Sequence, residues 1–234
     1  MKPALVIQHG PLGPPGILGE WMAERGIPMV VHRADESGAA WPDPRDHEFV
    51  AVLGSRFNPT DDVPPVAATR EAVDRAIEHD VPVLGLCFGG QMLASALGAP
   101  IEDVPDGPEL GWCRIDTVEP EAVPAGPWLT WHWQRFHPPA GAEVLATSPT
   151  GTQAFRHGRH VGVQFHPEST IDIVAGWARS DAERLRSLGV ADGEALLEEG
   201  RAHAETAARN ARTLFDGFLN RARNGRREKA DGAP

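Results

Sequence analysis

The sequence predicts an α/β fold: an open, mostly parallel twisted sheet with helices on both faces and an added antiparallel ribbon. Up to about residue 100, short apolar runs alternate with segments of helical period, which is typical of parallel strands joined by crossover helices. Between residues 101 and 163, short strands are separated by proline and glycine, which is typical of antiparallel ribbons.

The first half of the chain supplies the parallel core. Apolar runs short enough to be buried strands span residues 4–7, 28–32, 49–53 and 81–86. Apolar side chains at helical spacing predict helices over residues 17–25 and 66–79. Residues 91–97 have a helical composition that ends at Gly98.

The second half begins with shorter strands and ends in helices. Strands are predicted over residues 114–118, 143–147, 153–156 and 161–165, with a hairpin turn at residues 157–160. Residues 171–219 are rich in Ala, Glu, Leu and Arg and predict two or three helices, broken near Gly189 and Gly193. We expect one domain over residues 1–180, a helical extension over 181–220 packed on it, and a disordered tail over 221–234.

Composition excludes several classes of protein. The 234 residues are 41% hydrophobic and 24% charged, and no apolar run approaches the roughly 20 residues that a membrane-spanning helix needs. The net charge of −11 opposes binding to phosphate backbones. The apolar run near the N-terminus is too short for a secretory signal. We therefore expect a cytoplasmic protein that binds neither nucleic acid nor a membrane.

The most informative local pattern surrounds Cys87. Gly85-Leu86-Cys87-Phe88-Gly89 follows an apolar strand and precedes a helix, which is the form of a strand-to-helix elbow that carries a nucleophile. Larger flanking side chains would collide with the neighbouring strand and helix. The helix N-terminus favours a thiolate, and the N–H of Phe88 would face a developing oxyanion. The alternative is that Cys87 is merely a small buried side chain.

A second pattern supplies a base. The alternating strand over residues 161–165 leads into His166-Pro167-Glu168. Proline keeps His166 extended, and residues two apart in an extended segment face the same way. His166 and Glu168 should therefore point together, so that the carboxylate fixes the imidazole while its other nitrogen takes a proton from the thiol.

These residues together resemble the class I (triad-type) glutamine amidotransferase family. The segment Gly85-Leu86-Cys87-Phe88-Gly89-Gly90-Gln91 is similar to its nucleophile motif, and Val163-Gln164-Phe165-His166-Pro167-Glu168 is similar to its His/Glu motif. Similarity at Leu110-Gly111-Trp112 and Trp131-His132 extends the resemblance over most of residues 1–180. The chain looks like a stand-alone form, similar to the amidotransferase domain of GMP synthase, which implies a flavodoxin-like arrangement of the sheet.

The resemblance implies a role for each matching residue. Cys87 would attack the side-chain amide of glutamine, His166 would protonate the leaving ammonia and Glu168 would orient His166; water would then release glutamate. Gln91 and Gly54 fall at positions that would help hold the substrate.

One turn departs from the family pattern. The family usually has a Gly-Gly-Pro-like turn after the third strand, whereas this chain has Gly54-Ser55-Arg56. Serine also carries a backbone N–H, so Phe88 and Ser55 are the expected oxyanion donors.

We expect no cofactor and no metal. The glycines of residues 10–16 lack the Gly-x-Gly-x-x-Gly spacing, and the prolines there remove amides that would bind phosphate. His157 and His160 belong to the predicted turn, where we expect them to be solvated, and no paired Cys or carboxylate spacing completes a metal site.

The predicted function is a glutamine amidotransferase-like hydrolase with glutamine or a γ-glutamyl compound as substrate. No phosphate loop or pyrophosphatase loop of a synthase occurs in the sequence, so the ammonia would pass to a separate synthase subunit. One alternative is a stand-alone hydrolase of γ-glutamyl amines or peptides. Another is a catalytically weak regulatory or binding module, suggested by the altered turn at Ser55.

Overall fold

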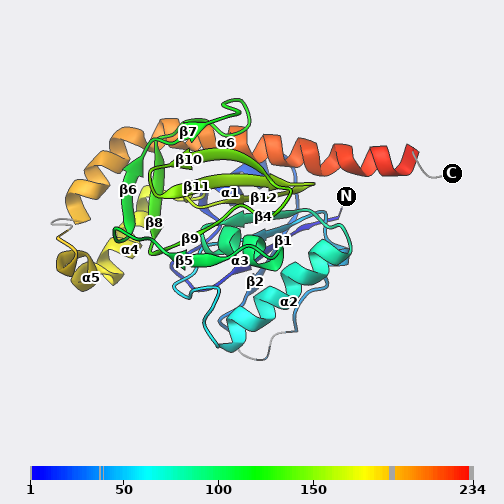
Figure 1. Ribbon diagram of the computed structural model, residues 1–234, viewed down its shortest axis with the longest axis horizontal. Helices are drawn as coiled ribbons and strands as arrows, with labels where there is room; N and C mark the ends of the chain where they lie inside the picture. Colours follow the sequence, from blue (N-terminus) through cyan, green and yellow to red (C-terminus); the bar gives the residue numbers. More distant parts are fainter. Residues whose placement is uncertain (1, 37, 39, 190–192, 232–234) are drawn as a thin grey trace.

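The protein is described by a computed structural model over residues 2–36, 38, 40–189 and 193–231. Within these residues, eight strands form the main sheet in the order β2-β1-β3-β4-β12-β11-β10-β7 (Figure 1). The strands from β2 to β12 in this order are parallel, and β11, β10 and β7 are antiparallel. Their bounds are β1 Ala4–Gln8, β2 Met29–Arg33, β3 Val50–Val52, β4 Val83–Leu86, β7 Asp116–Thr117, β10 Glu143–Ser148, β11 Gly151–His157 and β12 His160–Val163.

Helices cover both faces of the sheet because successive strand residues point to opposite sides. Ala4 and Val6 of β1 pack in the cluster that includes α1 (Gly16–Glu24) and α6 (Gly193–Asp231). Leu5 and Ile7 pack in the cluster with α2 (Pro64–Glu78) and α3 (Phe88–Ala96). A strand buried on both faces reads as a continuous apolar run, which is why the first strand is recognisable in the sequence.

Two antiparallel ribbons lie outside the main sheet. They pair β5 (Ile101–Asp103) with β9 (Gln134–Phe136), and β6 (Glu109–Cys113) with β8 (Trp128–His132). Leu129 and Trp131 of β8 pack in a third apolar cluster with side chains of α4 (Ile171–Ser180), α5 (Ala182–Ser187) and α6. The C-terminal helices are thus joined to the part of the molecule that carries β8.

The predicted α/β class, with its parallel core and antiparallel addition, is confirmed. The hairpin turn is also present, because His157 pairs with His160 across β11 and β12. The expectation that His160 is solvated was wrong: the residue is buried, and its Nδ1 accepts from the N–H of Val83 at 3.2 Å. The ring is buried because β4 lies beside β12 in the sheet. Turn propensity describes only the local hairpin and does not reflect such a neighbour.

The C-terminal region differs from the tail expected over residues 221–234. Helix α6 continues to Asp231, and residues 232–234 lie outside the described part of the chain. Ala222 is buried, and Arg223 pairs with Glu48 at 2.8 Å, so the helix still contacts the body beyond residue 220. The Ala, Arg, Glu and Lys of this segment are also good helix formers.

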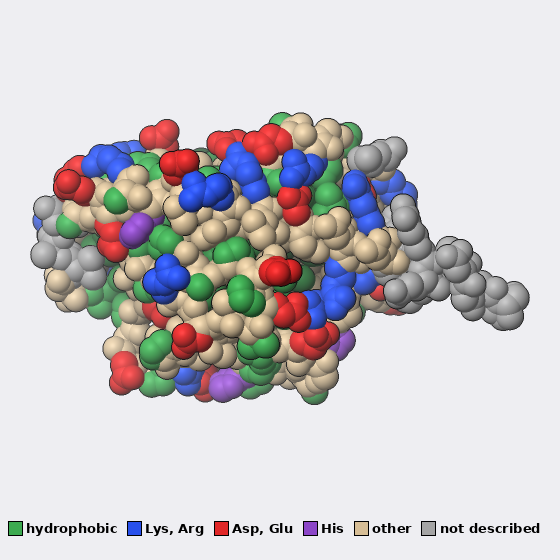
Figure 2. Space-filling model, turned by 90° about the horizontal axis from the view of Figure 1, so that it is seen from above, with side chains coloured by type: hydrophobic (Ala, Val, Ile, Leu, Met, Phe, Trp, Pro, Cys, Tyr) green, Lys and Arg blue, Asp and Glu red, His purple; other side chains and the backbone are tan. Residues whose placement is uncertain are grey.

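The surface mixes charges of both signs. Figure 2, which looks onto the α6 side, shows acidic and basic side chains intermingled on that face. Ion pairs join α1 to α6, such as Arg212 with Glu24 at 2.6 Å and Arg25 with Asp216 at 2.6 Å. None of the described helices is both long and apolar enough to cross a membrane.

The packing of α6 predicts a large loss of stability in Phe215→Ala. Phe215 is fully buried, with its ring centroid 5.4 Å from that of Trp21 on α1. Removing a buried phenylalanine leaves a cavity, so the free energy of unfolding in urea should fall by about 3–5 kcal/mol. Leu188→Ala, at an exposed leucine, is the matched control and should change it by less than about 0.5 kcal/mol. Equal effects of the two substitutions would contradict the packing of α6 as an integral layer.

Candidate active site

Cys87 lies at the turn between β4 and α3, at the carboxyl edge of the parallel sheet. Its backbone has φ 52° and ψ −107°, and φ in this range is unfavourable for a residue with a Cβ. Such a conformation costs about 1–3 kcal/mol and persists only where surrounding structure enforces it. Here the N–H of Cys87 donates to the carbonyl of Val163 on β12 at 2.9 Å, and α3 begins at the next residue. The thiol therefore stands at a helix N-terminus, as predicted.

The glycines around the elbow are required by contacts between backbones. A Cβ on Gly85 would lie 2.3 Å from the carbonyl oxygen of Gly89. A Cβ on Gly89 would lie 2.0 Å from the oxygen of Val52, and one on Gly90 would lie 2.4 Å from that of Val163. Real Cβ atoms do not approach this closely, so only glycine lets α3 pack against β3 and β12 in this way.

His166 and Glu168 are brought together as the alternation predicted. Nδ1 of His166 lies 2.8 Å from Oε1 of Glu168, and both side chains are almost completely buried. The N–H of His166 donates to the carbonyl of Leu129 on β8 at 2.8 Å, which fixes the backbone after β12. The second carboxylate oxygen, Oε2 of Glu168, is buried and has no hydrogen-bond partner among the described residues.

The electrostatic setting of His166 favours its charged form. Burial alone would lower its pKa, but the negative charges of Cys87 and Glu168, together with hydrogen bonds to both, raise the pKa well above 6.5. Nδ1 of the imidazole bonds to the carboxylate, and the Cys87 sulfur is close enough to affect the pKa of the ring.

The Gly54 turn lies directly against this imidazole. A Cβ on Gly54 would be 2.8 Å from Cε1 of His166, so a larger residue would displace the ring. Ser55 follows, and its hydroxyl accepts from the N–H of Phe57 at 3.1 Å. Ser55 is not among the described non-glycine residues with positive φ, so serine fits the second position of the turn without strain. Its role as an oxyanion donor, like that of Phe88, stays a prediction.

Gln91 is placed near Cys87 but is already engaged within the protein. Its side chain is buried, and Nε2 donates to the carbonyl of Gln134 at 2.7 Å and to Oε1 of Gln164 at 3.4 Å. Gln164 in turn directs Nε2 toward the Cys87 sulfur at 3.8 Å. The sequence reasoning missed Gln164, although the alternation that paired His166 with Glu168 places residue 164 on the same face.

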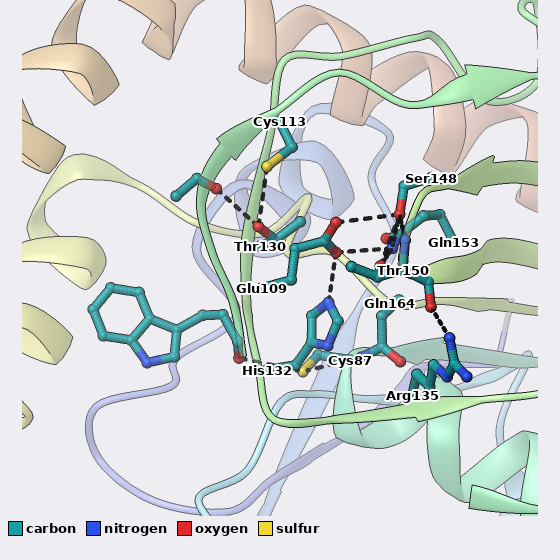
Figure 3. A network of polar contacts seen from close by, with 12 residues as sticks. Cys87, Glu109, Cys113, Thr130, His132, Arg135, Ser148, Thr150, Gln153 and Gln164 are labelled. Carbon is teal, nitrogen blue, oxygen red and sulfur yellow. Dashed lines mark hydrogen bonds and ion pairs between the residues drawn. The ribbon is translucent and has the colours of Figure 1, made fainter. Parts of the chain in front are cut away.

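A buried polar network extends from this point (Figure 3). Nε2 of His132 lies 2.8 Å from Oε2 of Glu109, and its Nδ1 lies 3.0 Å from the carbonyl of Gln134. Both ring nitrogens of His132 therefore lie within hydrogen-bond distance of an oxygen atom. Burial would raise the pKa of Glu109, but hydrogen bonding and charge from His132, with bonds from Gln153 and Thr150, lower it. A second buried His–Glu pair thus lies beside Cys87.

The other thiol lies in a different environment. Sγ of Cys113 is 3.5 Å from the hydroxyl of Thr130, and burial, with smaller contributions from Glu109 and Glu199, raises the pKa of this thiol. Cys113 is therefore paired with a hydroxyl, whereas the Cys87 sulfur faces the Trp131 carbonyl and the Gln164 side chain and raises the pKa of His166. In the described part of the chain, no cluster of three or more His, Cys, Asp or Glu side chains is arranged to hold a metal ion.

Comparisons with known proteins show what this chain is similar to. The chain is 32% identical over 127 residues to the GMP synthase [glutamine-hydrolyzing] of Alcanivorax borkumensis, a match that covers 47% of this chain and 24% of that protein. It is 35% identical over 109 residues to the anthranilate synthase component 2 of Archaeoglobus fulgidus, covering 42% of this chain and 60% of that protein. The chain thus spans about a quarter of the first relative and three fifths of the second.

A solved structure extends the similarity to the whole fold. The glutamine amido transferase from Methylobacillus Flagellatus superposes with a TM-score of 0.85 and 28% identity, over 94% of this chain and 95% of that one. The family model of glutamine amidotransferase class-I matches residues 21–173, more than half of the chain, and this range contains Cys87, His166 and Glu168. The chain therefore belongs to the class-I glutamine amidotransferase family.

Proposed function

We propose that this protein releases ammonia from glutamine through a thioester on Cys87, with Cys87, His166 and Glu168 as the catalytic residues. The observation that carries the proposal is the buried His166–Glu168 pair at the edge of the sheet, where the nearby Cys87 sulfur also raises the pKa of the imidazole. Membership of the class-I family supports glutamine as the substrate.

The proposed reaction proceeds in two steps. The thiolate attacks the amide carbon of glutamine, and the carbonyl electrons move to oxygen. As the tetrahedral intermediate collapses, His166 gives its proton to the leaving nitrogen, so that ammonia departs and a thioester remains. His166 then takes a proton from water, hydroxide attacks the thioester carbon, and glutamate leaves with the thiolate restored.

The oxyanion of each intermediate needs donors that are already in place. The N–H of Phe88, at the start of α3, and the N–H of Ser55 are the proposed donors. The helix N-terminus adds a partial positive charge at the same point. Gln91 and Gly54 complete the proposed site: Gly54 leaves room for His166, and Gln91 keeps Oε1 available for a substrate amine while its nitrogen holds Gln134 and Gln164.

We further propose that the ammonia passes to an acceptor on a partner synthase. Support comes from the Archaeoglobus relative, whose name describes one component of a synthase. The test is glutamine hydrolysis by the purified chain alone and with candidate synthases co-purified from its own cells. Stimulation by a synthase supports the proposal, whereas efficient unassisted hydrolysis of γ-glutamyl amines or peptides would favour a stand-alone hydrolase.

Cys87→Ser should reduce glutamine hydrolysis to background while the protein remains folded, because a hydroxyl ionises far less readily than a thiol. Released ammonia and glutamate measure the activity, and circular dichroism measures the fold. Cys113→Ser is the matched control and should be almost silent, since this thiol is bonded to Thr130 rather than to an imidazole. Loss of activity in Cys113→Ser but not in Cys87→Ser would show that Cys87 is not the nucleophile.

Glu168→Gln should lower the pKa of His166, because the substitution removes one of the two negative charges that raise it. NMR titration of the imidazole would then show the ring losing its proton at a lower pH than in the wild type. A raised folded pKa contributes stability below the unfolded value of about 6.5 that is lost as the pH rises through the folded pKa. That alkaline loss should therefore begin at lower pH in the variant. An unchanged titration would contradict the contact.

Gly54→Ala should lower kcat/KM for glutamine by about a hundredfold, because its Cβ would lie 2.8 Å from Cε1 of His166 and shift the ring. Gly10→Ala serves as the control: a Cβ there meets nothing within 4 Å, and activity should be retained. Steady-state kinetics on both variants decide the point, and an active Gly54→Ala would mean that the imidazole is not confined by this turn.

A further inference from the structure

Trp177, on α4, contacts the ring of His166. The two ring centroids are 4.7 Å apart and the rings are inclined at 64° in an edge-to-face arrangement. Edge-to-face contact at this distance is favourable between aromatic rings. Trp177 lies beyond residues 21–173, the range matched by the family model. The contact is therefore made by a segment outside the matched domain.

The indole is held by a hydrogen bond, and the helix that carries it is capped close to His166. Its N–H donates to the carbonyl of Leu12, in the loop between β1 and α1, at 2.6 Å. Helix α4 itself begins five residues after His166, and its first turn is capped by the hydroxyl of Thr170, which accepts from the N–H of Ile173 at 3.3 Å. The helix thus folds back directly from the strand end that carries His166.

Trp177 also contacts the strand that faces the nucleophile. Its ring is 5.8 Å from that of Trp131 on β8, and the carbonyl of Trp131 lies 3.9 Å from the Cys87 sulfur. The indole N–H of Trp131 donates to Asp181 at 3.3 Å, which ties β8 to the end of α4. One side chain therefore touches both the proposed base and the strand beside the proposed nucleophile.

We propose that Trp177 is a positioning residue, which holds the His166 imidazole in the orientation that pairs it with Cys87. The inference rests on the proposed function of His166. Gly54 limits the ring at its Cε1 edge, and Trp177 limits it from α4, so the imidazole has little freedom to turn away from the sulfur. The loop of residues 10–16 gains a role as well, because the Leu12 carbonyl anchors the indole.

Misplacing a catalytic group by about 1 Å can cost a hundredfold in rate, so the loss of this contact should be measurable. Because Trp177 acts through His166, its removal should lower kcat rather than raise the KM for glutamine. In Trp177→Ala we expect kcat to fall by roughly tenfold to a hundredfold, with KM changed by less than about threefold. Trp177→Phe keeps an aromatic ring but loses the bond to Leu12, and should recover much of the loss.

Trp112→Ala is the matched control. Trp112 is also partly buried, also donates through Nε1 to a main-chain carbonyl, that of Leu196 at 3.3 Å, and also contacts a histidine ring, that of His203 at 5.9 Å. It should cost stability without lowering kcat. Melting temperatures of all variants show that each remains folded at the assay temperature.

A second readout is independent of glutamine turnover. In a Cys113→Ser background, the rate at which iodoacetamide alkylates Cys87 at pH 7 reports the thiolate paired with His166. Trp177→Ala should slow this reaction several-fold at pH 7 and leave it unchanged at pH 10, where thiols are ionised without help and only access matters.

The inference is overturned if Trp177→Ala matches Trp112→Ala in both kcat and alkylation, or if KM alone changes, which would make Trp177 a substrate contact. If the wild type hydrolyses no glutamine, the proposed function fails. The alkylation profile still decides whether Trp177 positions His166, so the two failures are distinguishable.

Discussion

The close approach of backbones at the β4–α3 turn is the constraint on which the site depends. Cys87 is held at positive φ by its bond to Val163 and by glycines whose missing Cβ atoms allow α3 to meet β3 and β12. This geometry places the thiol at the sheet edge and at a helix N-terminus at once. The strain there is offset by packing of the parallel core, in which β4 is buried along its whole length.

Two buried histidine–glutamate pairs are the second feature of the site. His166 bonds to Glu168, and His132 lies between Glu109 and the Gln134 carbonyl. Buried polar groups without partners would be costly at this depth, whereas fully hydrogen-bonded ones rigidify their surroundings. Glu109 of β6 and His132 of β8 form the second pair, and the Trp131 carbonyl of β8 lies 3.9 Å from the Cys87 sulfur.

The C-terminal helices complete the same body. Helix α6 buries Leu214, Phe215 and Phe218 against the sheet and α1, while α4 and α5 pack against β8. Helix α4 also brings Trp177, which lies beyond the residues matched by the family model, into contact with the proposed base His166. The altered Gly54-Ser55 turn lies against the imidazole of His166, and Ser55 is not among the described non-glycine residues with positive φ.

Local patterns in the sequence were sufficient to predict the fold class, the elbow at Cys87 and the pairing of His166 with Glu168. Apolar runs mark buried strands, glycines flank a tight turn, and residues two apart in an extended segment share a face. The distant residues that meet these groups were not predictable in the same way, because their contacts arise from the packing of whole elements. Trp177 reaches the Leu12 carbonyl across 165 positions, and His132 meets Glu109 across 23, through strands whose pairing no local pattern specified. The burial of His160 and the docking of α6 past residue 220 likewise depend on packing, since propensity describes a segment and not its neighbours.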